Sequence, residues 1–224
     1  MLVRGLRLSE PPDLDIVRFI SSAVCHQIPG RMLEADGFAM PLCARCSGMY
    51  IGFFLALSAN AVLSLRRRAV DGAAARALAL ISVVVWAADG AANEFGLLHT
   101  PHAARFGLGL LMGLSLSPII VRLFLEELGV RPENSARRSA VLPALTVLCA
   151  ALITSINVRP MRAVLVAESV AAVAGLAMFL LLVHAALILT IWRRCEKKLA
   201  FAAAVVATCA EIFLLAAARA ALGV

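Results

Sequence analysis

The sequence has few charged side chains for its length. Only 16% of its 224 residues are Asp, Glu, Lys or Arg, whereas 62% are hydrophobic. An ordinary soluble domain is about 45–50% apolar, so this composition excludes a chain built around one water-soluble core. The apolar residues form runs of roughly 18 or more between Arg and Lys clusters, which is typical of a helical protein that crosses a membrane several times.

Acidic residues are scarcer than basic ones, 14 against 21, and the net charge is +7. A basic balance of this size can indicate a nucleic-acid partner. Here, however, the basic residues stand in short clusters between apolar runs, where lipid headgroups and membrane topology account for them. We therefore expect a lipid bilayer as the partner of the chain, and no nucleic acid.

Several common signatures are missing. The first 20 residues lack the apolar core of a cleavable signal peptide, so we expect the membrane helices themselves to direct insertion. The glycines of residues 105–113 follow no predicted strand and lack the spacing of a phosphate loop. The cysteine motif has no counterpart in the second half of the chain, which disfavours a transporter built from inverted repeats.

Apolar segments along the chain predict an all-α fold, a polytopic transmembrane helical bundle of about six spans. The spans are residues 47–65, 77–98, 104–125, 141–158, 163–192 and 199–218. The fifth is too long for one upright crossing, so it should tilt or protrude. Ahead of them, residues 13–24 have the apolar pattern of a short interfacial helix. We expect a single domain, with residues 1–46 as an N-terminal segment and 47–224 as the bundle.

Basic residues alternate between the loops and predict an orientation. One set of loops contains Arg66, Arg67, Arg68 and Arg76, then Arg122, Arg131, Arg137 and Arg138, then Arg193, Arg194, Lys197 and Lys198. The opposite set has only Arg105, then Arg159 and Arg162, then Arg219. By the positive-inside rule the Arg-rich loops are cytoplasmic. We therefore predict a multi-pass protein of the cell (cytoplasmic or inner) membrane, with both termini and the cysteine segment on the extracytoplasmic side.

The six cysteines fall into two groups. Cys149, Cys195 and Cys209 are scattered and are interpreted as small, largely buried apolar residues. Cys25, next to His26, is followed by Cys43 and Cys46 directly before the first apolar run. A helix that begins near Pro41 would place Cys43 and Cys46 on one face at the positive end of the helix dipole. That field favours the thiolate, the form that binds metals and attacks disulfides.

Three thiolates and one imidazole are enough for a tetrahedral zinc ion. We therefore predict a transition-metal site, with zinc the preferred ion, held by Cys25, His26, Cys43 and Cys46. Adjacent residues rarely ligate the same ion, so His26 could instead orient a ligand or act as a base. A disulfide between Cys25 and Cys43 or Cys46 is the competing interpretation, because the segment is predicted to face an oxidising compartment.

Ionisable residues also occur inside the predicted spans. Asp89 and Asn93 share one helix face, and a carboxylate within a membrane helix usually faces a partner or a water-filled cavity. Arg105, at the start of the next span, could pair with Asp89 or Glu94, or extend to the membrane surface. Three further ionisable residues are isolated in the sequence: Glu168, His184 and Glu211.

Four motifs resemble the domain-of-unknown-function 2085 family of predicted membrane proteins: "CHQIPGRM" at 25–32, "PLCARCSGMYIG" at 41–52, "DGAANEFG" at 89–96 and "RFGLGLLMG" at 105–113. The resemblance covers residues 20–115, about half the chain. It implies a membrane location and a set of site residues, but no reaction. Those residues are Cys25, His26, Gln27, Pro29, Arg31, Cys43, Arg45, Cys46, Gly48, Tyr50, Asp89, Gly90 and Arg105. The family often has Gln where this chain has Ala92 or Asn93, so a polar contact there could be shifted.

Three functions compete at this stage. The first is an integral membrane protein with a metal site of three cysteines and one histidine at one membrane face. Its supporting polar pocket would consist of Gln27, Arg31, Arg45, Tyr50, Asp89, Asn93 and Arg105. The second is a membrane thiol–disulfide oxidoreductase in which Cys43 attacks, Cys46 resolves and Cys25 passes electrons onward. The third is a small-solute or ion transporter whose path is lined by Asp89, Asn93 and Glu168. The sequence does not decide whether this protein is an enzyme.

Overall fold

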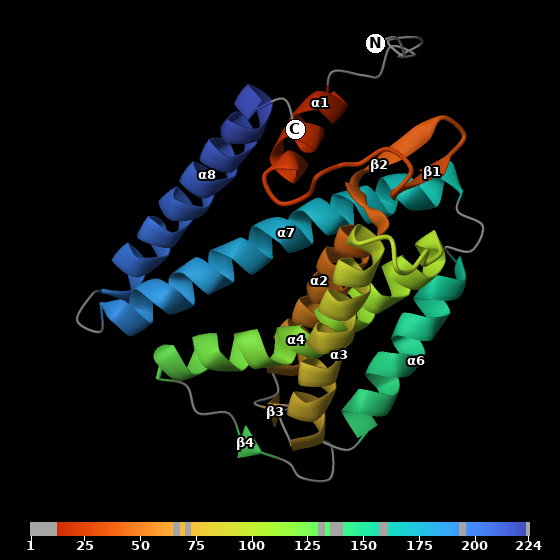
Figure 1. Ribbon diagram of the computed structural model, residues 1–224. Coiled ribbons are helices and arrows are strands. Elements are labelled where there is room, and N and C mark those ends of the chain that lie inside the picture. Colours follow the sequence, from red (N-terminus) through yellow and green to blue (C-terminus); the bar gives the residue numbers. More distant parts are fainter. Residues whose placement is uncertain are drawn as a thin grey trace.

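Helices make up most of the computed structural model, which describes residues 13–64, 68–69, 73–129, 133–134, 141–156, 161–192 and 196–222 (Figure 1). The helices are α1 (Asp13–Ser22), α2 (Ala44–Ser64), α3 (Ala73–Glu94), α4 (His102–Glu127), α6 (Val141–Ile156), α7 (Arg162–Ile191) and α8 (Lys197–Leu222). The strands are β1 (Met32–Ala35), β2 (Phe38–Cys43), β3 (Arg68–Ala69) and β4 (Glu133–Asn134). The helical bundle predicted from the sequence is confirmed.

Six helices, α2, α3, α4, α6, α7 and α8, coincide with the six predicted spans. Four of them, α3, α4, α7 and α8, are long and apolar enough to cross a membrane. The described parts of α2 and α6 form shorter apolar helices, so six crossings remain a prediction. The 30-residue length of α7 matches the long fifth segment, and Figure 1 shows α7 running obliquely to α2.

Two pairs of glycines form the centre of the bundle, where α2 crosses α4. A methyl group added at Gly48 or Gly52 would overlap a backbone carbonyl of α4. A methyl group at Gly109 or Gly113 would overlap a carbonyl of α2. Each pair is four residues apart, the small-residue spacing that lets two membrane helices approach closely. The glycines of α2 and α4 therefore serve close helix packing.

Helix α7 packs against the other side of α2. Gly175 lies against the carbonyl of Tyr50. The ring of Phe179 meets those of Tyr50 and Phe53 edge-on, with centroids 6.1 and 5.2 Å apart. Such aromatic pairs add about 0.5–1.5 kcal/mol beyond the area they bury. This packing fixes the orientation of α2, and α2 carries Cys46 and Arg45.

A β-hairpin precedes α2. Asp36 and Gly37 have positive φ angles of 51° and 74°, the turn chemistry of a two-residue hairpin. The strands are antiparallel, with Ala35 opposite Phe38 and Met32 opposite Cys43. The prediction that a helix begins near Pro41 is wrong: Cys43 ends β2, and α2 begins at Ala44. The Asp-Gly turn returns the chain in an extended conformation before the helix can start.

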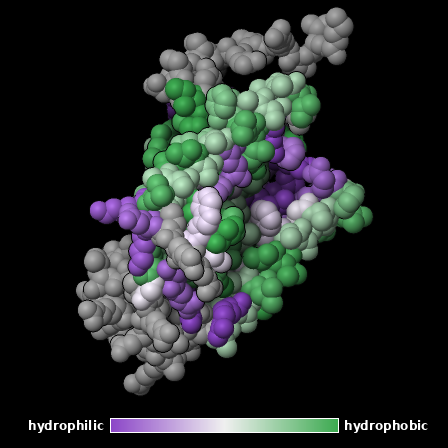
Figure 2. Space-filling model, turned by 90° about the vertical axis from the view of Figure 1, so that its left-hand side faces the viewer, coloured by the Kyte–Doolittle hydropathy of each residue, from purple (hydrophilic) through white to green (hydrophobic). Residues whose placement is uncertain are grey.

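The two ends of the bundle differ. α1, the β1–β2 hairpin and the end of α8 lie together at one end of the molecule, with β3 and β4 at the other (Figure 1). Between them, large apolar side chains are exposed on α3, α7 and α8, among them Leu80, Val170 and Leu214. Figure 2 shows hydrophobic residues over much of one such face. An exposed apolar belt of this kind suits contact with lipid.

Candidate metal and thiol site

Three cysteine sulfurs converge at the hairpin end of the bundle. Cys25 lies in the loop after α1, Cys43 is the last residue of β2, and Cys46 is in the first turn of α2. Their Sγ atoms all lie within 4.8 Å of one another. Cys25 is buried, Cys43 and Cys46 are half-buried, and all three are free thiols.

The local fold explains how residues 18 positions apart meet. The backbone N–H of Cys25 donates to the carbonyl of Ser21 and closes the end of α1. The hairpin then returns the chain, so that the backbone N–H of Cys43 donates to Sγ of Cys25 at 3.3 Å. Cys46 follows one turn later on α2. The cluster therefore depends on the hairpin, which carries Cys43 to the Cys25 loop.

Gln27 holds the Cys25 loop in place. Its backbone has a positive φ of 49°, a conformation that residues other than glycine seldom adopt. Its side-chain Nε2 donates to the carbonyl of Arg18 in α1 at 2.7 Å and to that of Pro41 in β2 at 2.9 Å. The amide thus ties α1 to the hairpin on either side of Cys25, a positioning role for a residue that the family resemblance had marked.

The three thiols are not electrostatically equivalent. Hydrogen bonds from the Cys25 thiol and then the Cys46 thiol lower the pKa of Cys43 well below its usual range, assisted by the backbone N–H groups of Cys46 and Arg45 and opposed by burial. The pKa of Cys25 is raised, chiefly because its thiol donates to Cys43 and also because it is buried. Cys43, directly before α2, is therefore expected to lose its proton before Cys25 does.

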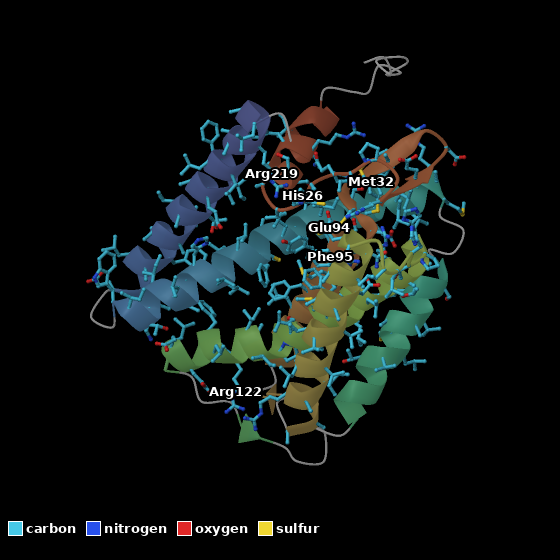
Figure 3. All side chains as sticks on the ribbon, viewed as in Figure 1. His26, Met32, Glu94, Phe95, Arg122 and Arg219 are labelled. Carbon is cyan, nitrogen blue, oxygen red and sulfur yellow. The ribbon has the colours of Figure 1, made fainter. Side chains whose placement is uncertain are left out.

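His26 does not join the cluster. Its imidazole is exposed, and the group of convergent ligand atoms among the described residues contains only the three cysteines. Figure 3 places His26 and Glu94 at the same end of the molecule, far from Arg122 at the other end. Of the four residues predicted to hold a metal, the structure brings three together.

A buried ion pair lies beside the cysteines. Arg45, between Cys43 and Cys46 in sequence, pairs through Nη2 with Asp89 of α3. Their side chains are 16% and 8% exposed. Asp89 also accepts hydrogen bonds from the Thr100 hydroxyl at 2.5 Å and the Asn93 amide at 3.0 Å. The predicted intramembrane carboxylate thus has a full set of partners.

The two remaining arginines of the predicted pocket also contact α3. Arg105 donates to the side-chain oxygen of Asn93 at 2.5 Å. The ion pair considered for Arg105 is thus replaced by a hydrogen bond to an amide, and the NH₂ group of that amide donates to Asp89. Arg31 donates to Glu94 at 2.8 Å in an exposed ion pair. These neighbouring polar groups form one set, hereafter the arginine cluster. It consists of Arg31, Arg45, Arg105, Asp89, Asn93, Glu94 and Thr100.

Gly90 and Thr100 are explained by this cluster. A methyl group at Gly90 would lie 3.2 Å from Nη1 of Arg45, so glycine beside Asp89 leaves room for the guanidinium against α3. Thr100 was not singled out from the sequence. Its loop carried only a weak signal, a hydroxyl residue between two histidines before the next helix. Its backbone N–H also donates to Asn93 at 3.1 Å, which ties the α3–α4 loop to the cluster.

Tyr50 lies one turn after Cys46 on α2 and is buried. Its ring packs against Phe179 of α7, so its position belongs to the α2–α7 contact rather than to the arginine cluster. It is nevertheless close enough to the three cysteines to interact with them electrostatically. The predicted polar pocket is therefore three features: an arginine cluster toward α3, a tyrosine toward α7, and Gln27 between α1 and the hairpin.

Comparison with known proteins covers the same part of the chain. The model of a family described as "Predicted membrane protein (DUF2085)" matches residues 25–119. An "Uncharacterized protein" of Methanothermobacter thermautotrophicus is 30% identical over 94 residues, 42% of this chain and 81% of the relative. The chain belongs to the domain-of-unknown-function 2085 family. "Uncharacterized protein MJ1492" of Methanocaldococcus jannaschii is 28% identical over 108 residues, 48% of this chain and 67% of the relative. No solved structure matches the chain.

The match begins at Cys25 and ends within α4, so the family region contains the hairpin, the cysteines and the arginine cluster. Helices α6, α7 and α8 lie outside it. The matched region therefore includes the segments that form the site and the α2–α4 crossing that supports it.

Proposed function

We propose that this membrane protein binds a transition-metal ion, zinc by preference, on the thiolates of Cys25, Cys43 and Cys46. The observation that carries the proposal is the convergence of three sulfurs within 4.8 Å from three separate segments of the chain. Thiolates are soft ligands that favour Zn²⁺, Cu⁺ and iron–sulfur centres over Mg²⁺ or Ca²⁺. The backbone N–H of Cys43 toward Cys25 adds the kind of hydrogen bond that orients a ligand.

The charges around the cysteines support the same proposal. Three thiolates with a divalent ion have one net negative charge. In the arginine cluster, three guanidinium groups face two carboxylates, which leaves one net positive charge. Arg105 is close enough to interact electrostatically with Cys43. The loaded site and the cluster would then be neutral together, which matters where burial makes a net charge costly.

The proposal does not require His26. A tetrahedral ion on three thiolates has one further position, which His26, water or a substrate group could take. Because the imidazole is exposed and outside the cluster, we expect His26→Gln to keep the metal with a modest loss of affinity. Complete loss in this variant would make His26 the fourth ligand.

Metal content of purified variants tests the proposal. The full chain in detergent should contain about one metal ion per molecule. Cys25→Ser, Cys43→Ser and Cys46→Ser should each lose it, because two thiolates seldom retain the ion alone. Cys149→Ser and Cys209→Ser are matched controls, since both cysteines are free and exposed, away from the cluster. Metal-free wild-type protein, or equal metal content in all five variants, would contradict the proposal.

A second function is favoured by the low pKa of Cys43. As a thiol–disulfide oxidoreductase, the Cys43 thiolate would attack a substrate disulfide, forming a mixed disulfide and releasing one substrate thiol. Cys46, once deprotonated, would attack Sγ of Cys43, releasing the second substrate thiol and leaving a Cys43–Cys46 disulfide. Thiol counting separates the oxidoreductase from the metal site. An oxidised cluster has lost two thiols and has no metal, whereas in a metal site every thiol is detected after the ion is chelated.

We also propose that the protein lies in the cell membrane with the cysteine end facing outward. Of the Arg-rich loops, the described strand β3, which contains Arg68, and the side chain of Arg122 lie at the opposite end from the cysteines. An excess of basic residues at one end is the sign of cytoplasmic loops. In Figure 3, Arg122 marks the Arg-rich end, and His26 and Glu94 mark the cysteine end.

A further inference from the structure

Helices α7 and α8, outside the region shared with the family, bring together two ionisable residues that are isolated in the sequence. Nε2 of His184 in α7 lies 3.2 Å from a carboxylate oxygen of Glu211 in α8. Glu211 is 14 residues from the start of α8 at Lys197 and 11 from its end at Leu222. At 1.5 Å per residue it lies about 16 Å or more from either end, so the pair sits well inside the apolar layer.

The other ring nitrogen fixes the protonation of the histidine. Nδ1 of His184 lies 2.9 Å from the backbone carbonyl of Leu180 and 3.0 Å from the Thr208 hydroxyl. A carbonyl can only accept a hydrogen bond, so Nδ1 must hold a hydrogen. A neutral histidine with hydrogen on Nδ1 leaves Nε2 as a bare lone pair. The facing carboxylate oxygen of Glu211 is buried and accepts no hydrogen bond from the described residues. Nε2 and this oxygen would therefore repel at 3.2 Å unless the pair takes up one more proton.

The surroundings favour a pair that has this proton. Leu214 and Leu215, one turn after Glu211 on the same side of α8, are exposed and suit acyl chains rather than water. An unpaired carboxylate there would be costly. Without the proton the pair has a charge of −1, with one proton it is neutral, and with two it is +1. The neutral form is therefore the one that the bilayer stabilises.

Other titratable groups lie farther along the elements packed against the pair. From α2, the Tyr50 phenol is close enough to Glu211 to interact electrostatically. On α8, Arg219 lies two turns beyond Glu211, and Lys197, at the start of the helix, donates to the Leu128 carbonyl at the end of α4. On α7, Glu168 lies 16 residues before His184. The pair itself is held by its mutual contact and by the Nδ1 contacts described above.

We propose that His184 and Glu211 form a proton-binding site inside the bilayer, in which the pair takes up one proton, on Nε2 or on the facing carboxylate oxygen. The proton can reside on either atom without changing the net charge, as imidazolium with carboxylate or as neutral imidazole with carboxylic acid. Nδ1 keeps its hydrogen in both forms. A group of this kind is what a proton path needs at its centre, and it is independent of the metal proposed at the cysteines.

Nitrogen NMR of the full chain with ¹⁵N-labelled histidine tests the site. Of the four histidines, His26, His99 and His102 are exposed and lie outside this pair, so their signals serve as the reference for solvent-exposed rings. His184 is assigned as the signal missing from His184→Gln, and its Nδ1 should show a bound hydrogen while its Nε2 shows a proton or a proton donor. In Glu211→Gln its Nε2 signal should move to that of an unprotonated ring nitrogen.

Glu168→Gln is the matched control, because it removes an intramembrane carboxylate that is about 24 Å along α7 from His184. It should leave the His184 signals unchanged. The proposal is overturned if Nε2 of His184 in the wild-type protein has the signal of an unprotonated ring nitrogen with no proton donor, a result that needs no variant to fold. It is equally overturned if Glu211→Gln folds and leaves the Nε2 signal of His184 where it was.

Discussion

At the scale of single residues, the Arg45–Asp89 pair links the cysteine segment to the bundle. Arg45 is flanked by two of the three thiols, and Asp89 lies on α3 with Asn93 and Thr100 as further partners. The guanidinium therefore joins the start of α2 to α3 directly beside the cluster. A substitution of Arg45 or Asp89 should therefore change both the stability of the protein and the positions of the cysteines.

We expect Asp89→Asn to destabilise the protein by about 3–5 kcal/mol, because it leaves a buried guanidinium without its counter-charge. Thermal unfolding in detergent measures the loss. The control is Glu94→Gln, which removes the exposed ion pair with Arg31 and should change the unfolding temperature little. Equal effects of the two variants would contradict the assignment of Arg45–Asp89 as the buried, structurally important pair.

Gln27→Glu should weaken metal binding about 10–100-fold, the usual effect of losing a group that orients a ligand. The new carboxylate would face the carbonyls of Arg18 and Pro41, to which Gln27 now donates. A metal-competition titration measures the change, with Glu34→Gln at an exposed position of the hairpin as control. Unchanged affinity in Gln27→Glu would mean that the Cys25 loop holds its position without this amide.

The sequence was most informative at this scale where the chemistry was local. The residue types at Cys25, Cys43, Cys46 and Asp89 pointed to one site, and the structure places them at the same end of the bundle. The partner of Arg105 was not predictable, because Asn93, Asp89 and Glu94 lie within two turns of one helix. Only three-dimensional packing decides which of them a side chain from α4 reaches.

At the scale of elements, the glycine crossing of α2 and α4 positions the site. Gly48 and Gly52 on one helix and Gly109 and Gly113 on the other bring the backbones into contact. Arg45 belongs to the same contact, since its carbonyl is what a methyl group at Gly109 would overlap. The packing of α4 and the placement of the cysteines are therefore coupled.

Gly109→Ala should destabilise the protein by about 1–3 kcal/mol, as expected for overpacking a tight contact, and should also reduce metal content. Ala167→Leu, on the exposed side of α7, is the control and should leave both unchanged. Unfolding in detergent and metal analysis of the same samples provide the measurement. A fully stable Gly109→Ala variant would show that the helices do not approach as closely as described.

The helices could be predicted because long apolar runs permit little else in a membrane. The hairpin could not be predicted from periodicity, since β1 has only four residues. The Asp36–Gly37 pair was a usable signal for it. The α7–α8 pair of His184 and Glu211 was beyond reach, because no spacing in the sequence indicates which turns of two separate helices will face each other.

At the scale of the whole molecule, the chain is a bundle whose two ends differ in charge and chemistry. The thiols, the arginine cluster and α1 gather at one end, and Arg122, one of the predicted cytoplasmic arginines, lies at the other (Figures 1 and 3). Orientation decides whether the thiols face an oxidising or a reducing compartment, and therefore whether a disulfide could persist there.

Cysteine labelling in intact cells tests the orientation. His102→Cys at the start of α4 should react with a membrane-impermeant maleimide from outside. Lys198→Cys, near the start of α8, should react only after permeabilisation, because the Arg- and Lys-rich loops are predicted to be cytoplasmic. Both positions are exposed, and the unsubstituted chain gives the background from its own cysteines. The reverse labelling pattern would place the cysteine end in the cytoplasm.

X-ray absorption spectroscopy of the metal in the purified, full-length protein tests the central claim most directly, because it reports which atoms surround the ion. We predict three sulfur neighbours at about 2.3 Å from the ion and at most one nitrogen or oxygen neighbour. If Cys43→Ser retains some metal, that metal should have one sulfur neighbour fewer. A shell of nitrogen and oxygen alone, or protein that has no metal when every thiol is reduced, would contradict the claim.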